Sequence, residues 1–212
     1  MEIINHFINY FLHLDQTISS VTAHWGPWTY VILFALIFCE TGLVVTPFLP
    51  GDSLLFVVGA LAAGGSLQLL TLILVLSAAA IGGNMVNYSI GVALAQRVLT
   101  GKSLPFVKQS YIIRTHEFFE KYGAKTIVIT RFVPIIRTFA PFLAGVGNMP
   151  YGRFTAYNTA GGLFWVLVGT LSGFFFGNLP FVRKNFSLVI LAIVIISLIP
   201  AALEFLKHKK AH

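Results

Sequence analysis

A run of 44 residues, Ser53 to Gln96, contains no Lys, Arg, Asp or Glu. Built as a single α-helix, it would extend about 66 Å, roughly twice the ~30 Å hydrocarbon core of a bilayer. The run therefore predicts more than one apolar segment, with a break between them. Over the whole chain, 57% of residues are hydrophobic and 10% are charged, with a mean hydropathy of +0.84. These values are typical of polytopic membrane proteins.

Charge and composition exclude several classes of function. The net charge of +7 lies mostly in short polar connections and in the C-terminal tail, so it indicates membrane orientation and anionic-lipid contact rather than nucleic-acid binding. The single cysteine, Cys39, cannot form an intrachain disulfide. All six histidines lie outside the expected spans, and these spans contain no hydrolase or metalloprotease motif. We therefore expect no enzyme activity, no cofactor and no metal site. The N-terminus lacks the features of a cleaved signal peptide.

The hydrophobic pattern predicts an all-α polytopic membrane protein with a single membrane domain, residues 1–212. Two apolar segments are too short or too interrupted by Pro and Gly to span, so they are expected to be re-entrant hairpins. In chain order the expected segments are an interfacial amphipathic helix (1–24), an apolar helix (28–39), re-entrant hairpin 1 (43–63), a span (67–94), a surface helix (103–122), re-entrant hairpin 2 (126–147), a span (154–176) and a last transmembrane helix (186–206).

The two hairpins are similar in sequence. Residues 45–50 (VTPFLP) resemble residues 129–134 (ITRFVP) at an offset of 84. The positive-inside rule places residues 97–125, the C-terminal tail and the N-terminus in the cytoplasm, which makes the hairpins enter from opposite faces. Opposed broken segments of this kind predict an inverted-repeat transporter with its site near the bilayer midplane. Chance similarity of apolar proline-containing segments is the alternative.

Four ionisable residues lie outside the polar connections and termini, namely Glu40, Asp52, Arg131 and Arg137. An arginine at the bilayer centre costs about 2.5 to 3.5 kcal/mol on insertion scales, so it needs a partner, a water-filled cavity or an anionic ligand. The planar guanidinium can bind two phosphate oxygens at once. We therefore expect Arg131 and Arg137 to bind a lipid phosphate and Glu40 and Asp52 to exchange protons. Static ion pairs that brace the bundle are the alternative.

Residues beside these charges complete the expected site. Positions on the two hairpins that could contact substrate are Gly51, Ser53, Pro134 and Thr138. Polar side chains that could support them at membrane depth are Asn84, Asn87, Tyr88 and Asn158. The alternative for the second group is plain hydrogen bonding between helices.

Three segments carry a resemblance to a known family. They read Phe-Cys-Glu-Thr-Gly at 38–42, Phe-Leu-Pro-Gly-Asp-Ser at 48–53 and Arg-Phe-Val-Pro-Ile-Ile-Arg-Thr-Phe-Ala-Pro at 131–141, with Asn-Tyr at 87–88 and Ala-Tyr-Asn at 156–158. Together they resemble the DedA family of integral membrane proteins, also called the VTT-domain group. The resemblance covers nearly the whole chain, and its motifs are specific in combination.

The resemblance implies two opposed re-entrant hairpins and a lipid-transport function. The implied substrate is undecaprenyl phosphate, or a related anionic lipid, carried back across the bacterial plasma membrane for recycling. Protons and membrane lipids are the other implied partners, together with dependence on the proton-motive force and roles in envelope homeostasis and antimicrobial resistance. Glu40, Asp52, Arg131 and Arg137 match the family's functional charges. Some members carry an acidic residue where this chain has Asn84, so a third carboxylate role does not transfer to that position.

Other functions compete with a coupled lipid flippase. A proton-coupled antiporter of small cations or drugs could use the same carboxylates, although arginines in the site argue against a cationic substrate. An uncoupled phospholipid scramblase would move lipid equally with and without a proton gradient. The sequence leaves the oligomeric state open, a homo-oligomer included.

Overall fold

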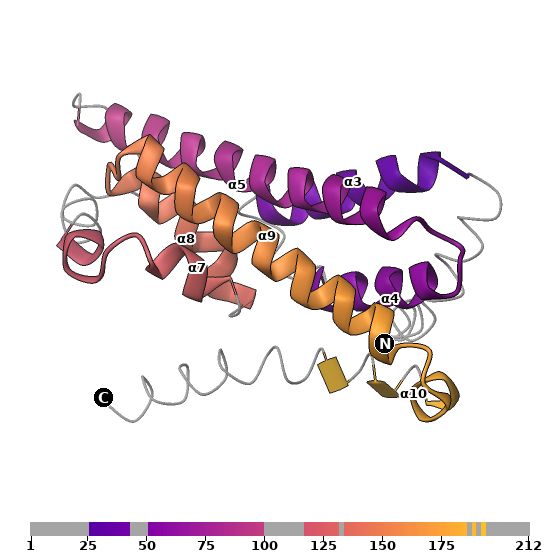
Figure 1. Ribbon diagram of the computed structural model, residues 1–212. Helices are drawn as coiled ribbons and strands as arrows, with labels where there is room; N and C mark the ends of the chain where they lie inside the picture. The colour runs from indigo at the N-terminus through magenta and orange to yellow at the C-terminus, as the bar shows by residue number, and fades with distance from the viewer. Residues whose placement is uncertain are drawn as a thin grey trace, which may run out of the picture. The chain divides into compact units, whose positions relative to one another are not determined.

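The computed structural model describes residues 26–42, 51–99, 117–131, 134–185, 188–189 and 192–193 (Figure 1). The regular structure in these ranges is helical. Residues 117–122 form a short helix. The other helices are α3 (Trp28–Gly42), α4 (Gly51–Ala63), α5 (Leu69–Leu99), α7 (Thr126–Thr130), α8 (Pro134–Val146), α9 (Tyr151–Phe176) and α10 (Pro180–Lys184).

Two of these helices, α5 and α9, are long and apolar enough to cross a membrane, with mean hydropathies of 2.1 and 1.6 over their candidate spans. With 31 and 26 residues they extend about 46 and 39 Å, beyond the ~30 Å hydrocarbon core. The helices α4 and α8 have 13 residues each, about 20 Å, which is too short to span. The predicted break in the long uncharged run is confirmed, since that run divides into α4 and α5.

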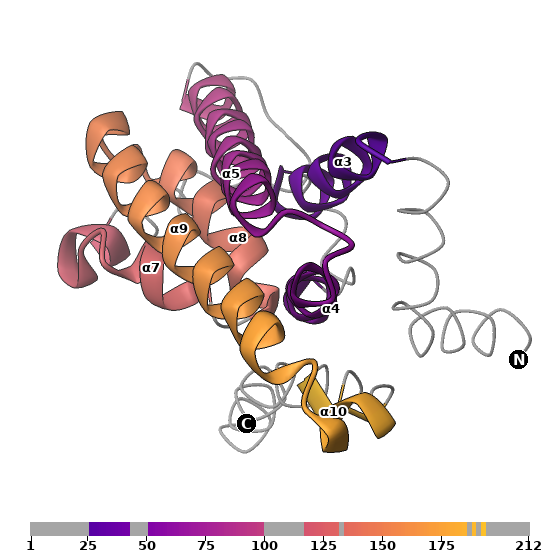
Figure 2. The same cartoon turned by 45° about the vertical axis from the view of Figure 1, so that its right-hand side comes forward.

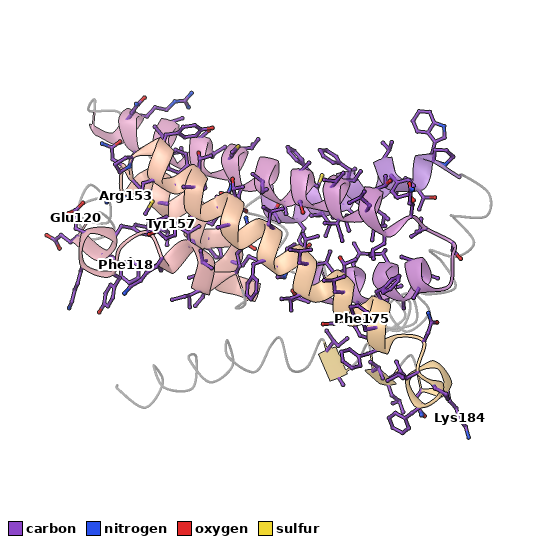
Figure 3. The ribbon with its side chains drawn as sticks, viewed as in Figure 1. Phe118, Glu120, Arg153, Tyr157, Phe175 and Lys184 are labelled. Atoms are coloured by element: carbon purple, nitrogen blue, oxygen red, sulfur yellow. The ribbon has the colours of Figure 1, made fainter. Side chains whose placement is uncertain are left out.

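Apolar side chains cover much of the surface of the long helices. Leu70 and Leu74 of α5 are 66% and 61% exposed, and Phe164 and Phe175 of α9 are 54% and 65% exposed. Figure 3 shows Phe175 projecting outward near the C-terminal end of α9. Such a surface is unfavourable in water and favourable in lipid. The described helices therefore have the apolar surface expected of a membrane protein.

Several helix boundaries differ from the predicted ones. The span expected over 67–94 continues to Leu99, because the polar residues that end the uncharged run are compatible with a helix. The helix α4 begins at Gly51, so Asp52 lies inside its first turn, where a carboxylate is favoured by the helix dipole. Between the segments predicted as a span (154–176) and a last transmembrane helix (186–206) lies the short helix α10, which begins with Pro180 at a position that proline favours.

Some predictions fall on residues outside the described ranges. These are the interfacial helix 1–24, the first part of hairpin 1 (43–50), most of the surface helix (103–116) and nearly all of the last transmembrane helix (186–206). The assignment of the whole chain to one membrane domain also stays a prediction. Of the segment predicted as a surface helix, the structure describes only residues 117–122, which are helical and are followed by Gly123 with a φ of +73°.

The two short helices end in the same way. Each closes with a Schellman motif, in which a residue with positive φ follows the helix and the next N–H bonds back to a carbonyl five residues earlier. The residues with positive φ are Gly65 (82°) after α4 and Asn148 (55°) after α8. The closing bonds run from Ser66 N to Leu61 O (3.1 Å) and from Met149 N to Ala144 O (3.0 Å). At each motif the chain changes direction and leads from the short helix into the long helix that follows it.

The chain divides into two compact units. Unit 1 comprises Met1–Leu36, Pro50–Ser77 and Trp165–His212, and unit 2 comprises Ile37–Leu49 and Ala78–Phe164. Within unit 1, α4 lies beside the C-terminal half of α9 (Figure 1). Within unit 2, α7 and α8 lie against the N-terminal half of α9 in both views (Figures 1 and 2).

A buried core joins the helices of unit 2. The ring of Tyr88 on α5 stacks on that of Phe154 on α9, with centroids 4.3 Å apart and planes at 19°, and its hydroxyl donates to the carbonyl of Met149. Around this stack lie Phe119, Ala124, Ile127, Ala140 and Ala144. Because these residues come from α5, α7, α8, α9 and the helix at 117–122, the core fixes the elements that carry the polar residues described below.

In unit 1, α4 and α9 approach each other backbone to backbone through glycines. A Cβ atom added to Gly59 would lie 2.1 Å from the carbonyl oxygen of Thr170. A Cβ atom added to Gly173 would lie 1.9 Å from the carbonyl oxygen of Phe56. The contact is reciprocal. Each glycine packs against a backbone carbonyl of the opposite helix, and that carbonyl belongs to the residue three positions before the opposite glycine.

The same reciprocal contact occurs in unit 2, between α8 and α5. A Cβ atom on Gly145 would lie 2.1 Å from the carbonyl oxygen of Tyr88, and one on Gly91 would lie 2.2 Å from that of Phe142. Small residues at such crossings let membrane helices gain van der Waals contact, which replaces the hydrophobic driving force available in water. In each unit a short helix is thus packed closely on part of a long one.

This packing predicts that Gly145→Ala destabilises the protein. The added methyl would meet a backbone carbonyl that cannot rotate away, so we expect a loss of about 1–3 kcal/mol, typical of overpacking. The matched control is Gly152→Ala on α9, where nothing lies within 4 Å of the added Cβ and a gain of about 0.5–1 kcal/mol is expected. Unfolding titrations in detergent measure both. Equal stabilities of the two variants would contradict the close contact.

Candidate functional site

The structure divides the four predicted charges between the two units. Unit 2 contains Glu40 in the last turn of α3, Arg131 directly after α7 and Arg137 near the start of α8. Their exposed fractions are 2%, 1% and 4%. Asp52 belongs to unit 1. The predicted site residues therefore form two sets, one in each unit, and each set is described by itself.

Glu40 and Arg137 form a buried ion pair in unit 2, in which Nη2 of Arg137 donates to Oε1 of Glu40. Both side chains are almost fully buried. Burying two charges costs several kcal/mol per ion and is offset only when the groups meet in good geometry. The charge of Arg137 is therefore neutralised by this contact in the described conformation.

One amide holds the backbone on both sides of this pair. Nδ2 of Asn87 donates to the carbonyl of Thr41 (3.1 Å) and to the carbonyl of Thr138 (2.8 Å). Thr41 follows Glu40 in the chain, and Thr138 follows Arg137. The carbonyl of Thr41 lies in the last turn of α3, where backbone acceptors lack helical partners. Asn87 thereby satisfies a helix end and sets the spacing of the two backbones that carry the ion pair.

Arg131 is bound to α9 by an uncharged residue. Its Nη2 donates to the side-chain oxygen Oδ1 of Asn158 and to the backbone carbonyl of the same residue at 3.2 Å. Within the described ranges, its Nε and Nη1 have no hydrogen-bond partner, and no carboxylate pairs with it. The positive charge of Arg137 also opposes that of Arg131. Arg131 is thus a buried cation whose charge the described side chains do not neutralise.

Two glycines of α9 make room for this guanidinium. A Cβ atom on Gly161 would lie 3.2 Å from Cδ of Arg131, and one on Gly162 would lie 3.2 Å from its Nη2. Sequence reasoning did not single out this pair. The spacing in the sequence could have indicated it, because Gly161 follows Asn158 by about one helical turn and so lies on the same face of α9.

An amide network continues from Arg131 to α5. Nδ2 of Asn84 donates to Oδ1 of Asn158 at 3.0 Å, and Nδ2 of Asn158 donates to the carbonyl of Ile81 at 3.0 Å. Within the described ranges, Oδ1 of Asn84 and Oδ1 of Asn87 are buried without a hydrogen-bond partner. An unsatisfied buried donor or acceptor costs about 1–3 kcal/mol, and more when it is charged. These atoms and the two nitrogens of Arg131 are therefore where a polar ligand would be stabilised most.

Asp52 has a partner that sequence reasoning missed. Nε1 of Trp165, on α9, donates to Oδ1 of Asp52 at 2.6 Å, and Trp165 is 3% exposed. Tryptophans of membrane proteins usually indicate an interface, whereas this one is buried and donates to a carboxylate. Asp52 and Trp165 are 113 positions apart, so only the tertiary structure reveals the contact.

The remaining predicted site residues occupy the same helices. In unit 1, Gly51 begins α4 and Ser53 is fully buried in its first turn. In unit 2, Pro134 begins α8, and Thr138 is buried with its carbonyl bonded to Asn87, as described above. Among the described residues, no group of three or more His, Cys, Asp or Glu could hold a metal ion.

Comparison with known proteins places these residues in a family context. A family model described as the VTT domain matches residues 49–175. Protein DedA of Escherichia coli is 47% identical over 213 residues, covering 100% of this chain and 97% of that protein. An uncharacterized membrane protein of Mycobacterium tuberculosis is 42% identical over 171 residues, covering 80% of this chain and 75% of its own. Inner membrane protein YqjA of E. coli is 37% identical over 155 residues, covering 73% and 70%. No solved structure matches the chain.

The buried ion pair predicts an asymmetric response to substitution. Arg137→Met should destabilise the protein by about 3–5 kcal/mol, because the carboxylate of Glu40 is left buried and unpaired. Adding Glu40→Gln should recover part of this loss, since a neutral amide needs no counter-charge. The control is Lys184→Met on exposed α10, with a change within about 0.5 kcal/mol (Figure 3). Unfolding in detergent compares the wild type, both single variants, the double variant and the control. Additive losses from the two substitutions would contradict the coupling.

Proposed function

The chain belongs to the DedA family of membrane proteins, and we propose that it translocates undecaprenyl phosphate, a polyprenyl-phosphate carrier lipid, across the bacterial plasma membrane. The observation that carries the proposal is the buried guanidinium of Arg131, whose Nε and Nη1 have no partner in the described part of the chain. A phosphate group offers the acceptor oxygens and the negative charge that this side chain lacks.

The two arginines have different roles in this proposal. Arg131 is the primary phosphate ligand, because Asn158 positions it without neutralising it. Arg137 is held by Glu40 until that contact opens. A second cation available only in one state would let the protein bind phosphate more tightly in that state, which is what a transport cycle requires.

Glu40 links this change to protons. When its carboxylate takes up a proton, the ion pair loses its negative member and the guanidinium of Arg137 becomes free to bind a phosphate oxygen. When the lipid leaves, Glu40 releases the proton and the pair forms again. Asp52 is the second proton-exchanging group that we propose, with the indole of Trp165 as its hydrogen-bond donor. Carboxylates at membrane depth are typical components of such relays.

An inverted repeat of two re-entrant hairpins would accommodate this cycle. The 13-residue helices α4 and α8, their Schellman ends and the reciprocal glycine contacts favour a repeated unit of one short and one long helix. In transporters built this way, substrate and coupling ions bind between the repeats. We keep the proposed orientation with both termini in the cytoplasm.

The transport of small cations or drugs is less consistent with the site. Arg131 is a positive charge without a carboxylate partner among the described residues, and it would repel a cationic substrate. A passive scramblase could use the same phosphate ligand. The difference lies in coupling, because a scramblase would not respond to a proton gradient.

We expect Arg131→Ala to abolish translocation of undecaprenyl phosphate in proteoliposomes, and Arg131→Lys to reduce it at least about tenfold, since lysine keeps the charge but not the planar fork. The matched control is Arg153→Ala, an exposed arginine of α9, which should transport normally (Figure 3). Normal transport by a folded Arg131→Ala protein would contradict the proposed role.

We expect Glu40→Gln to remove the response of transport to an imposed proton gradient before it removes lipid binding. The amide cannot exchange a proton, and it leaves Arg137 permanently without its counter-charge. The measurement compares initial transport rates with and without the gradient. A wild-type protein that ignores the gradient would identify a scramblase, and a variant that still responds would exclude Glu40 as the coupling group.

A further inference from the structure

We infer that Asn84 makes this site selective for phosphate monoesters over phosphodiesters, by accepting a hydrogen bond from the P–OH group that only a monoester retains. The inference rests on the proposed function, because it concerns the phosphate that Arg131 binds. In this inference, a neutral amide makes the site bind a polyprenyl monophosphate in preference to the phosphodiester phospholipids of the surrounding membrane.

The orientation of the Asn84 amide is determined by its neighbours. Oδ1 of Asn158 accepts from Arg131, a group that can only donate, so this atom is an oxygen. Nδ2 of Asn84 donates to that same oxygen. The remaining atom of the Asn84 amide is therefore its carbonyl oxygen. It is buried, it accepts no hydrogen bond from the described residues, and it cannot be turned into a donor without breaking the network.

The amide that carries this acceptor shares a hydrogen-bond partner with Arg131. Nη2 of Arg131 and Nδ2 of Asn84 bond to one and the same oxygen of Asn158, so the guanidinium and the amide are neighbours. Arg131 retains Nε and Nη1 as unpartnered donors. The neighbouring guanidinium and amide therefore offer two donors with a positive charge and one neutral acceptor. All three residues belong to unit 2.

A singly protonated phosphate monoester matches this arrangement. Its bare oxygens can accept from Arg131, and its hydroxyl can donate to Asn84. The second ionisation of such esters has a pKa of about 6, so about half of the ester is in this form at pH 6 and about a tenth at pH 7. A buried site with one unneutralised cation shifts this balance, because it favours a single negative charge over two. A phosphodiester carries the same charge but has no hydroxyl. It would bind Arg131 and leave the oxygen of Asn84 buried and unsatisfied.

Bulk solvent does not reach these atoms in the described conformation. Asn84 and Arg131 are each 1% exposed, and Gly161 and Gly162 pack against the guanidinium. The described conformation is thus closed around these atoms, and a ligand reaches them only when the helices separate. A site that closes around its ligand discriminates strongly against an analogue that lacks one hydrogen-bonding group.

The test uses two probes, farnesyl phosphate and its monomethyl ester, titrated into the full chain in dodecyl maltoside at pH 5. This pH is about one unit below the second ionisation, so both probes carry mostly one negative charge and differ in the hydroxyl that the ester replaces with a methoxy group. We expect the wild type to bind farnesyl phosphate about tenfold or more tightly than the methyl ester, the effect of one buried hydrogen bond. In Asn84→Leu the two probes should bind within about twofold of each other. The ratio reports selectivity even if both affinities fall because Arg131 is less well positioned.

Two further variants complete the design. Asn84→Asp keeps an acceptor oxygen but loses the nitrogen that donates to Asn158. The preference for farnesyl phosphate should persist, while both affinities fall because the carboxylate repels phosphate and partly neutralises Arg131. Because this variant is close in size to asparagine, it tests the inference even if Asn84→Leu does not fold. The matched control is Asn178→Leu in unit 1, which removes a part-buried amide bonded to the carbonyl of Ala60 and should leave the preference unchanged.

Each outcome separates the inference from the proposed function. Equal binding of both probes by the wild type, or an undiminished preference in Asn84→Leu, would overturn the role of Asn84 and leave phosphate binding at Arg131 intact. Loss of the preference in Asn84→Asp would also overturn it. Failure of the wild type to bind either probe would overturn the proposed function as well.

Discussion

The bond between Arg131 and Asn158 is the interaction on which the rest of the polar interior depends. The guanidinium of Arg131 keeps its positive charge when it is buried, and the apolar interior disfavours that charge. Asn158 stabilises this charge only through the dipoles of its side-chain oxygen and its backbone carbonyl, which accept hydrogen bonds from Arg131. The charge is thereby held in place without being cancelled. An aspartate at this position would have made a static ion pair and removed the attraction for an anion.

Close helix packing makes this arrangement available. Gly161 and Gly162 leave space for the guanidinium against α9, while Gly91 and Gly145 let α5 and α8 meet backbone to backbone. Side chains with a Cβ at these positions would separate the helices, and the amides of Asn84 and Asn87 could then no longer reach their partners. The polar network and the glycine contacts are therefore parts of one packing solution, in which van der Waals contact compensates for the burial of polar groups.

The two buried arginines in the described part of unit 2 differ in how far their charge is neutralised. Arg137 meets a carboxylate, and Arg131 meets only amides and carbonyls. Both have the same chemistry and both lie in one broken apolar segment, so their sequence context does not distinguish them. Asn87 is what separates their environments, since it holds α3 and α8 at the spacing that lets Glu40 reach Arg137. These contacts agree with the proposed roles, in which Arg131 is always available to bind phosphate and Arg137 is available only when its contact with Glu40 opens.

The sequence by itself determined the class of the protein, its long and short helices, and the identity of its buried charges. Hydrophobic run length, Pro and Gly breaks and isolated charges are local properties, and the lengths of α4, α5, α8 and α9 depend on little else. Only the tertiary structure decided the partners. Glu40 lies 97 positions from Arg137, and Asp52 lies 113 positions from Trp165, and no local pattern encodes such pairings. They depend on how helices far apart in the chain pack, which is set by many weak contacts acting together.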